Sequence, residues 1–249
     1  MDLVDPKQRF SATVEMYDRY RPSYPKELLD WVVEKSGVRP GARVADVGCG
    51  TGISTRLLAG RGFDVTGVEP NPDMLARAQA HGGAAYIQGE AAATGLPAGA
   101  FGLVTAAQAF HWFPVEAALA EFKRVLKPGG ACAAFWNDRT NDTPFMKEYE
   151  ELLLRSSTEY KRLRGKAGAI ADIAASPRVV GLERADFRNV QAMDRGVFLG
   201  RVYSSSYVAH GVAEPRRLAL DLDALFDRHE AGGMVEFVYR AAAFCWRLA

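Results

Sequence analysis

The stretch Val44-Ala45-Asp46-Val47-Gly48-Cys49-Gly50-Thr51-Gly52 decides the fold of this 249-residue chain. It reads as a buried strand that runs into a loop with glycine at every second position, and a helix is predicted behind it from residue 53. Glycine lets the backbone turn tightly and approach a ligand without an intervening Cβ atom. The first N–H groups of the following helix have no partners within the helix. This order of elements predicts a ligand site at the end of the strand.

A second strand, predicted over residues 63–68, ends at Glu69, an acid that suits the ribose hydroxyls of a nucleoside. Dinucleotide sites share these elements, but their G-x-G-x-x-G fingerprint needs a third glycine where this chain has Ile53. A phosphate-binding P-loop is excluded as well, because no Gly-Lys-Ser/Thr follows the loop. Asp46 would repel a pyrophosphate. It suits a ligand that carries an amino group and a positive centre.

Four segments, in this order along the chain, resemble the motifs of class I S-adenosylmethionine-dependent methyltransferases. Residues 46–52 resemble the family's first motif, and residues 67–75 resemble its ribose-binding segment. Residues 89–97, ahead of Phe101, resemble the adenine-side motif. Residues 126–130 resemble the loop before the fifth strand. The set is much more specific than the glycine loop alone.

The resemblance implies an α/β, Rossmann-like sheet of seven strands, mostly parallel with an antiparallel edge and with helices on both faces. It implies S-adenosylmethionine as cofactor and S-adenosylhomocysteine as product. Met74 could contact the adenine or fill the core, and Glu90 could serve the adenine side with the Ala91 backbone or be solvated. The predicted cofactor-binding residues are Tyr17, Arg21, Asp46, Gly48, Cys49, Gly50, Thr51, Gly52, Glu69, Pro70, Met74, Glu90, Ala91 and Gln108.

Residues 17–25 resemble an N-terminal segment found in a small-molecule branch of the family, which includes trans-aconitate and quinone-pathway methyltransferases. In that branch the segment folds over the cofactor pocket. The resemblance implies that Tyr17 faces the sulfonium, where an aromatic ring gains cation–π stabilisation, and that Arg21 pairs with the methionine carboxylate. The alternative is that the tyrosines only pack the helices together, which is the role we expect for Tyr24.

His111 is the candidate catalytic residue. It lies in residues 108–113, which resemble the family's fourth motif at the methionine end of the cofactor. A carboxylate acceptor is already nucleophilic, whereas a phenol, hydroxyl or amine needs a base within hydrogen-bonding reach. A histidine among aromatic residues can also be a wall of the pocket. The remaining histidines have no spacing that indicates a metal site.

The pattern predicts a single methyltransferase domain over residues 1–249, with four parts. These are an N-terminal helical cap (1–38), a cofactor-binding core (39–137), a helical insertion (138–180), and C-terminal strands and helices that complete the sheet (181–249). Strands are expected at 43–47, 63–68, 84–88, 101–107, 131–136, 187–193 and 234–246. Helices are expected at 10–20, 25–37, 53–60, 72–81, 115–125, through 204–207 and at 214–229.

Composition narrows the function further. The chain is 48% hydrophobic and 24% charged with a net charge of +1, so no global field favours nucleic acid or a membrane as partner. No signal peptide or membrane span is expected, and three scattered cysteines indicate a reducing cytoplasm. We expect methyl transfer to a carboxylate or hydroxyl oxygen of a small molecule. The alternatives are an RNA or protein methyltransferase that uses the basic run 161–166, or a non-catalytic cofactor-binding regulatory subunit.

Overall fold

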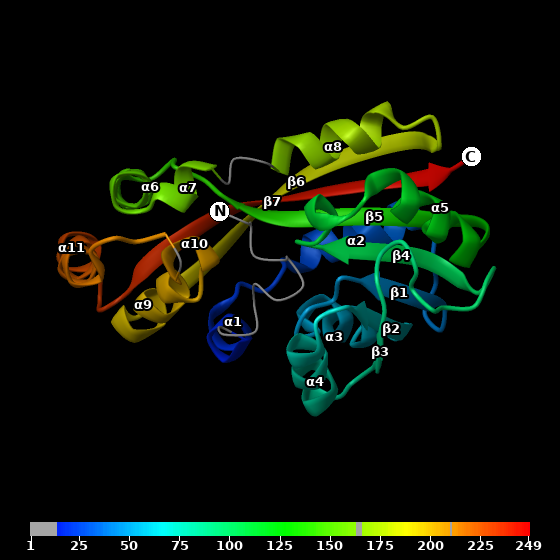
Figure 1. Ribbon diagram of the computed structural model, residues 1–249, viewed down its shortest axis with the longest axis horizontal. Coiled ribbons are helices and arrows are strands. Elements are labelled where there is room, and N and C mark those ends of the chain that lie inside the picture. Colours follow the sequence, from blue (N-terminus) through cyan, green and yellow to red (C-terminus); the bar gives the residue numbers. More distant parts are fainter. Residues whose placement is uncertain (1–13, 163–165, 210) are drawn as a thin grey trace.

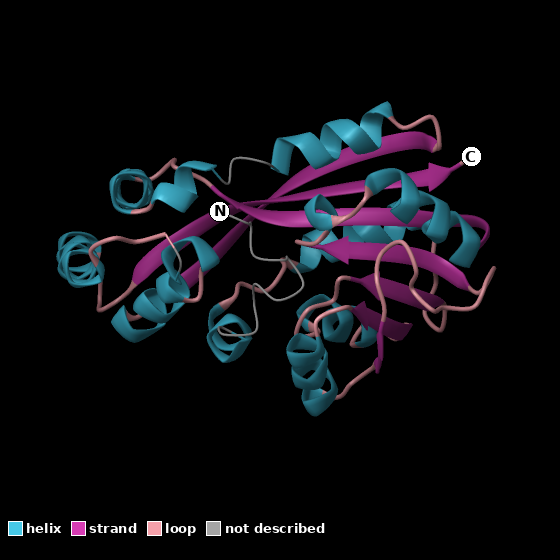
Figure 2. Ribbon diagram, in the orientation of Figure 1, coloured by secondary structure: helices cyan, strands magenta, loops and turns pink. Residues whose placement is uncertain are grey.

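A computed structural model describes residues 14–162, 166–209 and 211–249. Its centre is one seven-stranded sheet with the strand order β3-β2-β1-β4-β5-β7-β6. β7 is antiparallel to β5 and β6, and the other neighbouring strands are parallel. Helices cover both faces (Figures 1 and 2). The predicted mostly parallel α/β sheet with an antiparallel edge is therefore confirmed.

The bounds of the elements follow the chain. The strands are β1 (Arg43–Val47), β2 (Asp64–Glu69), β3 (Ala85–Gln88), β4 (Phe101–Ala107), β5 (Leu126–Arg139), β6 (Val179–Met193) and β7 (Val235–Leu248). The helices are α1 (Val14–Tyr20), α2 (Lys26–Ser36), α3 (Ile53–Ala59), α4 (Pro72–His81), the 3-10 helix η2 (Phe110–Trp112), α5 (Val115–Val125), α6 (Pro144–Ser156), α7 (Thr158–Arg162), α8 (Lys166–Ala175), α9 (Arg195–Tyr203), α10 (Ser206–Ala209) and α11 (Pro215–His229).

The predicted bounds differ from these mainly in the C-terminal half. β6 begins at residue 179 instead of 187, because an edge strand with exposed Glu183 and Arg184 carries no apolar run to reveal it. β5 is also longer than residues 131–136, since Leu126 already pairs with Phe101 of β4. The helix predicted through residues 204–207 is interrupted, because the Ser204 hydroxyl donates to a backbone oxygen of α9 where that helix ends.

Three clusters of buried side chains hold the layers together. One lies between the sheet and helices α5 and α8, and a second lies between the sheet and helices α2 and α3. The third joins α6, α9 and α11 to the outer ends of β6 and β7, on the left in Figure 1. The predicted insertion is thus divided: α6 and α7 pack in the outer cluster, whereas α8 returns to the sheet. No pattern in the sequence predicted this outer cluster.

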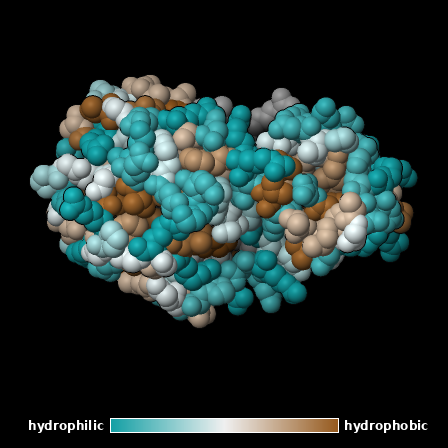
Figure 3. All heavy atoms as spheres, turned by 180° about the vertical axis from the view of Figure 1, so that it is seen from behind, coloured by the Kyte–Doolittle hydropathy of each residue, from teal (hydrophilic) through white to brown (hydrophobic). Residues whose placement is uncertain are grey.

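Seen from behind, the surface is mostly hydrophilic, and hydrophobic side chains occur in small separate groups (Figure 3). No helix of the described residues is long and apolar enough to cross a membrane.

Candidate functional site

The glycine loop is packed on two sides and open at its centre. Gly48, Gly50 and Gly52 all have left-handed φ angles, of 69°, 57° and 83°, which L-residues rarely adopt. A Cβ atom at Gly48 would lie 2.6 Å from Ala109 Cβ, and one at Gly52 would lie 2.6 Å from the Tyr86 hydroxyl. At Gly50 nothing lies within 4 Å of such an atom. The loop therefore presents bare backbone to open space at this position.

Glu69, at the end of β2, faces this loop. Its carboxylate accepts hydrogen bonds from the backbone N–H groups of Gly50 (2.9 Å) and Asn71 (3.0 Å). Burial, opposed by these two bonds and reinforced by Asp46, raises the pKa of Glu69 above its usual value. Asn71 in turn caps α4 by accepting from two backbone N–H groups, which fixes the turn after β2. The end of β2 and the loop after β1 thus form one polar unit.

Asp46 lies underneath the loop and is fully buried. Its carboxylate accepts hydrogen bonds from the hydroxyls of Ser54 (2.6 Å), Thr55 (2.7 Å) and Thr105 (2.8 Å). Burial raises the pKa of Asp46 in spite of these three donors. This arrangement ties β1 to α3 and β4. The predicted direct contact between Asp46 and a ligand has no room in it, so Asp46 acts on the site through its charge and by fixing the loop.

Cys49 and Thr51 support the loop from inside. Both side chains are buried, and burial raises the pKa of the Cys49 thiol well above its ordinary value. Such a thiol is not a nucleophile at neutral pH. Cys49, Cys132 and Cys245 are all free and buried. Thr51 also offers its backbone oxygen to Arg56 at 2.7 Å.

The end of β4 contributes a strained residue. Gln108 has φ 56°, and no other described residue besides glycine has a positive φ. Its backbone N–H donates to the Phe135 backbone oxygen (2.9 Å), and its side-chain amide donates to the Asn137 backbone oxygen (3.2 Å). Both acceptors belong to β5, which therefore holds Gln108 in place. Strain of this kind concentrates at functional sites. No residue pattern in the sequence indicated it.

His111 lies three residues after Gln108, in η2. Its Nδ1 accepts a hydrogen bond from the indole N–H of the buried Trp136 (3.3 Å). A neutral imidazole that accepts at Nδ1 carries its proton on Nε2. In this tautomer His111 can donate a hydrogen bond from Nε2, but it offers no lone pair there for proton abstraction.

Helix α1 bridges the cofactor-binding core and the outer cluster. Asp18, whose side chain is 5% exposed, accepts from Arg77 Nε and contacts His81 Nε2 on α4, both at 2.7 Å. Two residues further along α1, the Tyr20 ring occupies the space where a Cβ atom of Gly200 would be; such an atom would lie 2.3 Å from Tyr20 Cζ. The predicted cap segment thus spans the gap between α4 and α9. Tyr17 lies on α1, but its side chain is outside the described part of the structure.

The segment 89–97, which the sequence predicts as the adenine-side wall, runs from the end of β3 toward β4. Glu90 is exposed and its backbone pairs with that of Ala93, while Ala91 is buried. Met74 is 3% exposed on α4, and Pro70 is half-buried.

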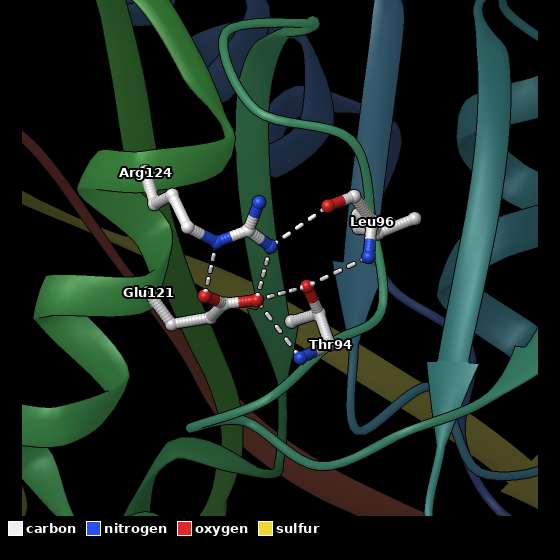
Figure 4. Close-up of polar contacts among 4 residues, drawn as sticks. All are labelled: Thr94, Leu96, Glu121 and Arg124. Atoms are coloured by element: carbon white, nitrogen blue, oxygen red, sulfur yellow. Dashed lines mark hydrogen bonds and ion pairs between the residues drawn. The ribbon is translucent and has the colours of Figure 1, made fainter.

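An ion pair on α5, between the buried Glu121 and the partly exposed Arg124, holds this segment in place (Figure 4). Glu121 accepts from the Thr94 backbone N–H (2.9 Å) and hydroxyl (2.5 Å), and from Arg124 (2.7 Å). Arg124 donates in addition to the Leu96 backbone oxygen (2.7 Å). Arg124, with the Thr94 donors, lowers the pKa of Glu121 to about 2. The sequence reasoning missed this network, because its members are far apart in the chain and follow no motif.

A second missed feature lies beyond the carboxyl end of β5. The Arg139 guanidinium donates to the hydroxyls of Tyr207, Tyr149 (3.4 Å) and Tyr160 (2.9 Å), and its charge lies about as close to all three rings. Arg201 on α9 donates to Tyr239 (3.2 Å) and to the Ser205 hydroxyl (3.0 Å). We call these two arginines and four tyrosines the Arg–Tyr cluster.

The structure therefore brings most predicted residues to one edge of the sheet. Gly50, Glu69, Gln108 and His111 lie at or just after the carboxyl ends of β1, β2 and β4, where α/β sheets bind ligands. Within the described residues, no group of three His, Cys, Asp or Glu side chains is placed to hold a metal ion.

Comparisons with known proteins agree on one family. Residues 45–134 match the family model described as a methyltransferase domain. An uncharacterized methyltransferase of Mycobacterium tuberculosis is 38% identical over 148 residues, which are 59% of this chain and 59% of that protein. The chain thus spans about three-fifths of the length of this relative.

Two further proteins match over larger shares. A ubiquinone biosynthesis O-methyltransferase of Bordetella avium is 30% identical over 176 residues, 66% of this chain and 71% of that protein. A solved structure from Anaeromyxobacter dehalogenans, assigned as a type II methyltransferase, is 26% identical with a TM-score of 0.72, covering 92% of this chain and 98% of that one. The motifs, the strand order and these similarities together establish that the chain belongs to the class I S-adenosylmethionine-dependent methyltransferases.

Proposed function

We propose that this chain transfers a methyl group from S-adenosylmethionine to an oxygen atom of a small-molecule acceptor, a carboxylate or a hydroxyl. The observation that carries the proposal is the open backbone at Gly50 beside the Glu69 carboxylate. Backbone without a Cβ atom can approach the ligand, and the carboxylate can accept from ribose hydroxyls. The cofactor supplies an electrophilic methyl group when it is bound.

The charges around the loop fit this cofactor better than a dinucleotide. Asp46 and Glu69 are both buried beside the loop, and each has a raised pKa. A negative pyrophosphate would add a third charge of the same sign, whereas a sulfonium offsets the two carboxylates. The absence of a glycine at position 53 points the same way.

The residues near the acceptor supply position more than proton transfer. Methyl transfer is an in-line displacement, for which orientation of donor and acceptor gives much of the acceleration. Gln108 is fixed by β5, and His111 is oriented by Trp136 with its proton on Nε2. Both can orient an acceptor by donating hydrogen bonds. The lack of a free imidazole lone pair favours a carboxylate, which needs no base, over a phenol.

The relative from Bordetella avium supports a small-molecule acceptor and an oxygen atom, since its name describes ubiquinone biosynthesis and O-methylation. The alternative of an RNA or protein substrate depends on the basic run 161–166, whose side chains are outside the described part of the structure. That alternative stays a prediction, as does the cytoplasmic location.

Turnover tests the proposal. We would incubate the purified chain with S-adenosylmethionine and a panel of carboxylic acids, phenols and a bulk RNA, and measure S-adenosylhomocysteine by chromatography. We expect product with at least one carboxylic acid or phenol, none without an acceptor, and none with the Glu69→Ala variant. Cofactor binding without turnover on any acceptor would favour the non-catalytic alternative. Product with RNA alone would refute the small-molecule acceptor.

A further inference from the structure

The Arg–Tyr cluster contains two buried positive charges without a matching negative one. Arg201 is 5% exposed, and Arg139 is enclosed by three tyrosine rings. Among the described residues neither guanidinium has a carboxylate within ion-pair distance, and their side-chain partners are hydroxyls. Glu150, whose charge acts on Arg139, accepts its hydrogen bond from Tyr160. Buried cations without counter-ions are costly and are normally paired.

The two charges also act against each other. Burial works to lower the pKa of Arg201, the surrounding tyrosines raise it overall, and Arg139 opposes them. Although burial would raise the pKa of Tyr207, Arg139 and Arg201 bring it down to about 8. At pH 7 this phenol is therefore mostly protonated and does not neutralise the pair. An anion placed between the two guanidiniums would relieve both the burial cost and the repulsion.

The position of the cluster links it to the active site. Arg139 ends β5 two residues after Asn137, whose backbone oxygen accepts from the strained Gln108. Tyr20 of the cap packs on Gly200, the neighbour of Arg201. The charge of Arg21, the next residue of the cap, contributes to the lowered pKa of Tyr207. The cap thus contacts α4 through Asp18 and reaches the cluster through Tyr20 and Arg21.

Solvent-accessible space lies beside the cluster. Arg139 and Tyr239 both line a surface hollow of about 420 Å³, and its other charged residues are Arg188, Arg240, Asp142 and Asp186. The hollow is large enough for a small organic acid, and ligand sites in proteins have volumes of this order.

We propose that the Arg–Tyr cluster is the subsite for an anionic group of the methyl acceptor, a carboxylate or a phosphate held by Arg139 and Arg201 from opposite sides. This inference rests on the proposed function and narrows it to anionic small molecules. Guanidinium groups recognise both anions through paired N–H donors. The tyrosine hydroxyls keep the two side chains oriented toward the subsite when it is empty.

Calorimetry on the complex with S-adenosylhomocysteine tests the proposal apart from catalysis. The probes are sodium succinate, sodium citrate and inorganic phosphate, with neutral succinamide as control, all at constant ionic strength. We expect at least one anion to bind and succinamide to be silent; the carboxylates and phosphate distinguish the two anion classes. Arg139→Gln and Arg201→Gln should each weaken that binding at least tenfold and leave S-adenosylhomocysteine affinity within twofold.

Arg195→Gln is the matched control, because Arg195 lies on the same helix as Arg201 but is paired with Asp223 and Asp227. Tyr207→Phe keeps both charges and remains informative if the arginine variants fail to fold. In the wild type, anion affinity should fall as the pH rises through 8, because the Tyr207 phenolate then competes for Arg139 and Arg201. The other groups that face Tyr207 are Tyr149, Tyr160 and Arg21, with Glu150 behind Tyr160. In Tyr207→Phe this fall should be absent.

Three results would overturn the proposal: no anion binds the complex, Arg195→Gln lowers affinity as much as the cluster variants do, or Tyr207→Phe keeps the fall above pH 8. Loss of S-adenosylhomocysteine affinity in the arginine variants would also overturn it, since the cluster would then hold the cofactor's own carboxylate. Failure of the wild type to bind S-adenosylhomocysteine at all would refute the proposed function instead.

Discussion

Replacing Glu121 by alanine should destabilise the chain and weaken cofactor binding together. Glu121 is the only acceptor recorded for the Thr94 backbone N–H among the described residues, and Thr94 is fully buried. Removing that acceptor costs about 1–3 kcal/mol for the unsatisfied donor. It also frees Arg124, which steadies the backbone at Leu96. The segment 89–97, which we propose as the adenine-side wall, would lose its anchor on α5.

The charge of Glu121 contributes separately. Its pKa falls from 4.5 to about 2 in the folded chain. At about 1.4 kcal/mol per pKa unit, this shift would correspond to about 3 kcal/mol of folding stability. Because Arg124 is partly exposed, solvent screening reduces this contribution to about 1–2 kcal/mol. Glu121→Gln, which keeps one acceptor oxygen, should lose about this amount at pH 7. Glu121→Ala should lose about 2–4 kcal/mol in total.

The pH dependence has a definite sign. A carboxyl with a lowered pKa in the folded state stabilises fully above its unfolded pKa near 4.5, and the stabilisation disappears as the pH falls toward 2. The difference between wild type and Glu121→Gln in urea unfolding should therefore be largest at pH 7 and shrink by about half or more at pH 3.

Glu116 on the same helix provides the control, because its side chain is 60% exposed where it pairs with Arg178. Glu116→Gln should stay within about 0.5 kcal/mol of the wild type at both pH values. The reasoning would be refuted if Glu121→Ala lost less than about 0.5 kcal/mol of unfolding free energy. It would also be refuted if the difference in unfolding free energy between wild type and Glu121→Gln were equal at pH 3 and pH 7.

Three further changes test the site itself. Glu69→Ala should reduce S-adenosylhomocysteine affinity at least tenfold by calorimetry, while the far-UV circular dichroism spectrum stays unchanged. Asp64→Asn, at the exposed start of the same strand, should have no effect. A Glu69→Ala variant with the affinity of the wild type would refute the assignment of Glu69 to the ribose. Gly50→Ala should cost only about 1 kcal/mol in unfolding, for its left-handed φ, but should lower cofactor affinity more than that stability loss explains; unchanged affinity would mean that no ligand approaches this backbone. His111→Ala should keep S-adenosylhomocysteine affinity within twofold and lower kcat/KM. The acid limb of the profile of kcat/KM against pH should not move. Loss of that limb would show that His111 is a base.

The sequence was sufficient for the cofactor half because its determinants are local. The strand before Gly48, the glycine spacing and the acid at position 69 are each set within a few residues, so their ranges and their meeting at one sheet edge could be predicted. The register β1–β4 and β1–β2 then follows from parallel pairing of buried runs. The position of each of these residues in the fold could therefore be predicted from its near neighbours in the sequence.

The Arg–Tyr cluster could not be predicted, because its determinants are not local. Arg139 meets Tyr149, Tyr160 and Tyr207 across as many as 68 residues of chain, and none of these residues belongs to a recurring pattern. The strain at Gln108 is also invisible in sequence, since β5, a distant segment of the chain, helps to enforce it. Asp46 shows the opposite error: its charge suited a ligand, but the hydroxyls of Ser54, Thr55 and Thr105 enclose it.

The most direct test of the central claim is calorimetric titration of the purified chain with S-adenosylmethionine, S-adenosylhomocysteine and NAD. The geometry of the glycine loop and Glu69 predicts micromolar binding of both adenosyl ligands and no heat with NAD. Binding of NAD, or no binding of either adenosyl ligand, would contradict the assignment of this loop as the cofactor site.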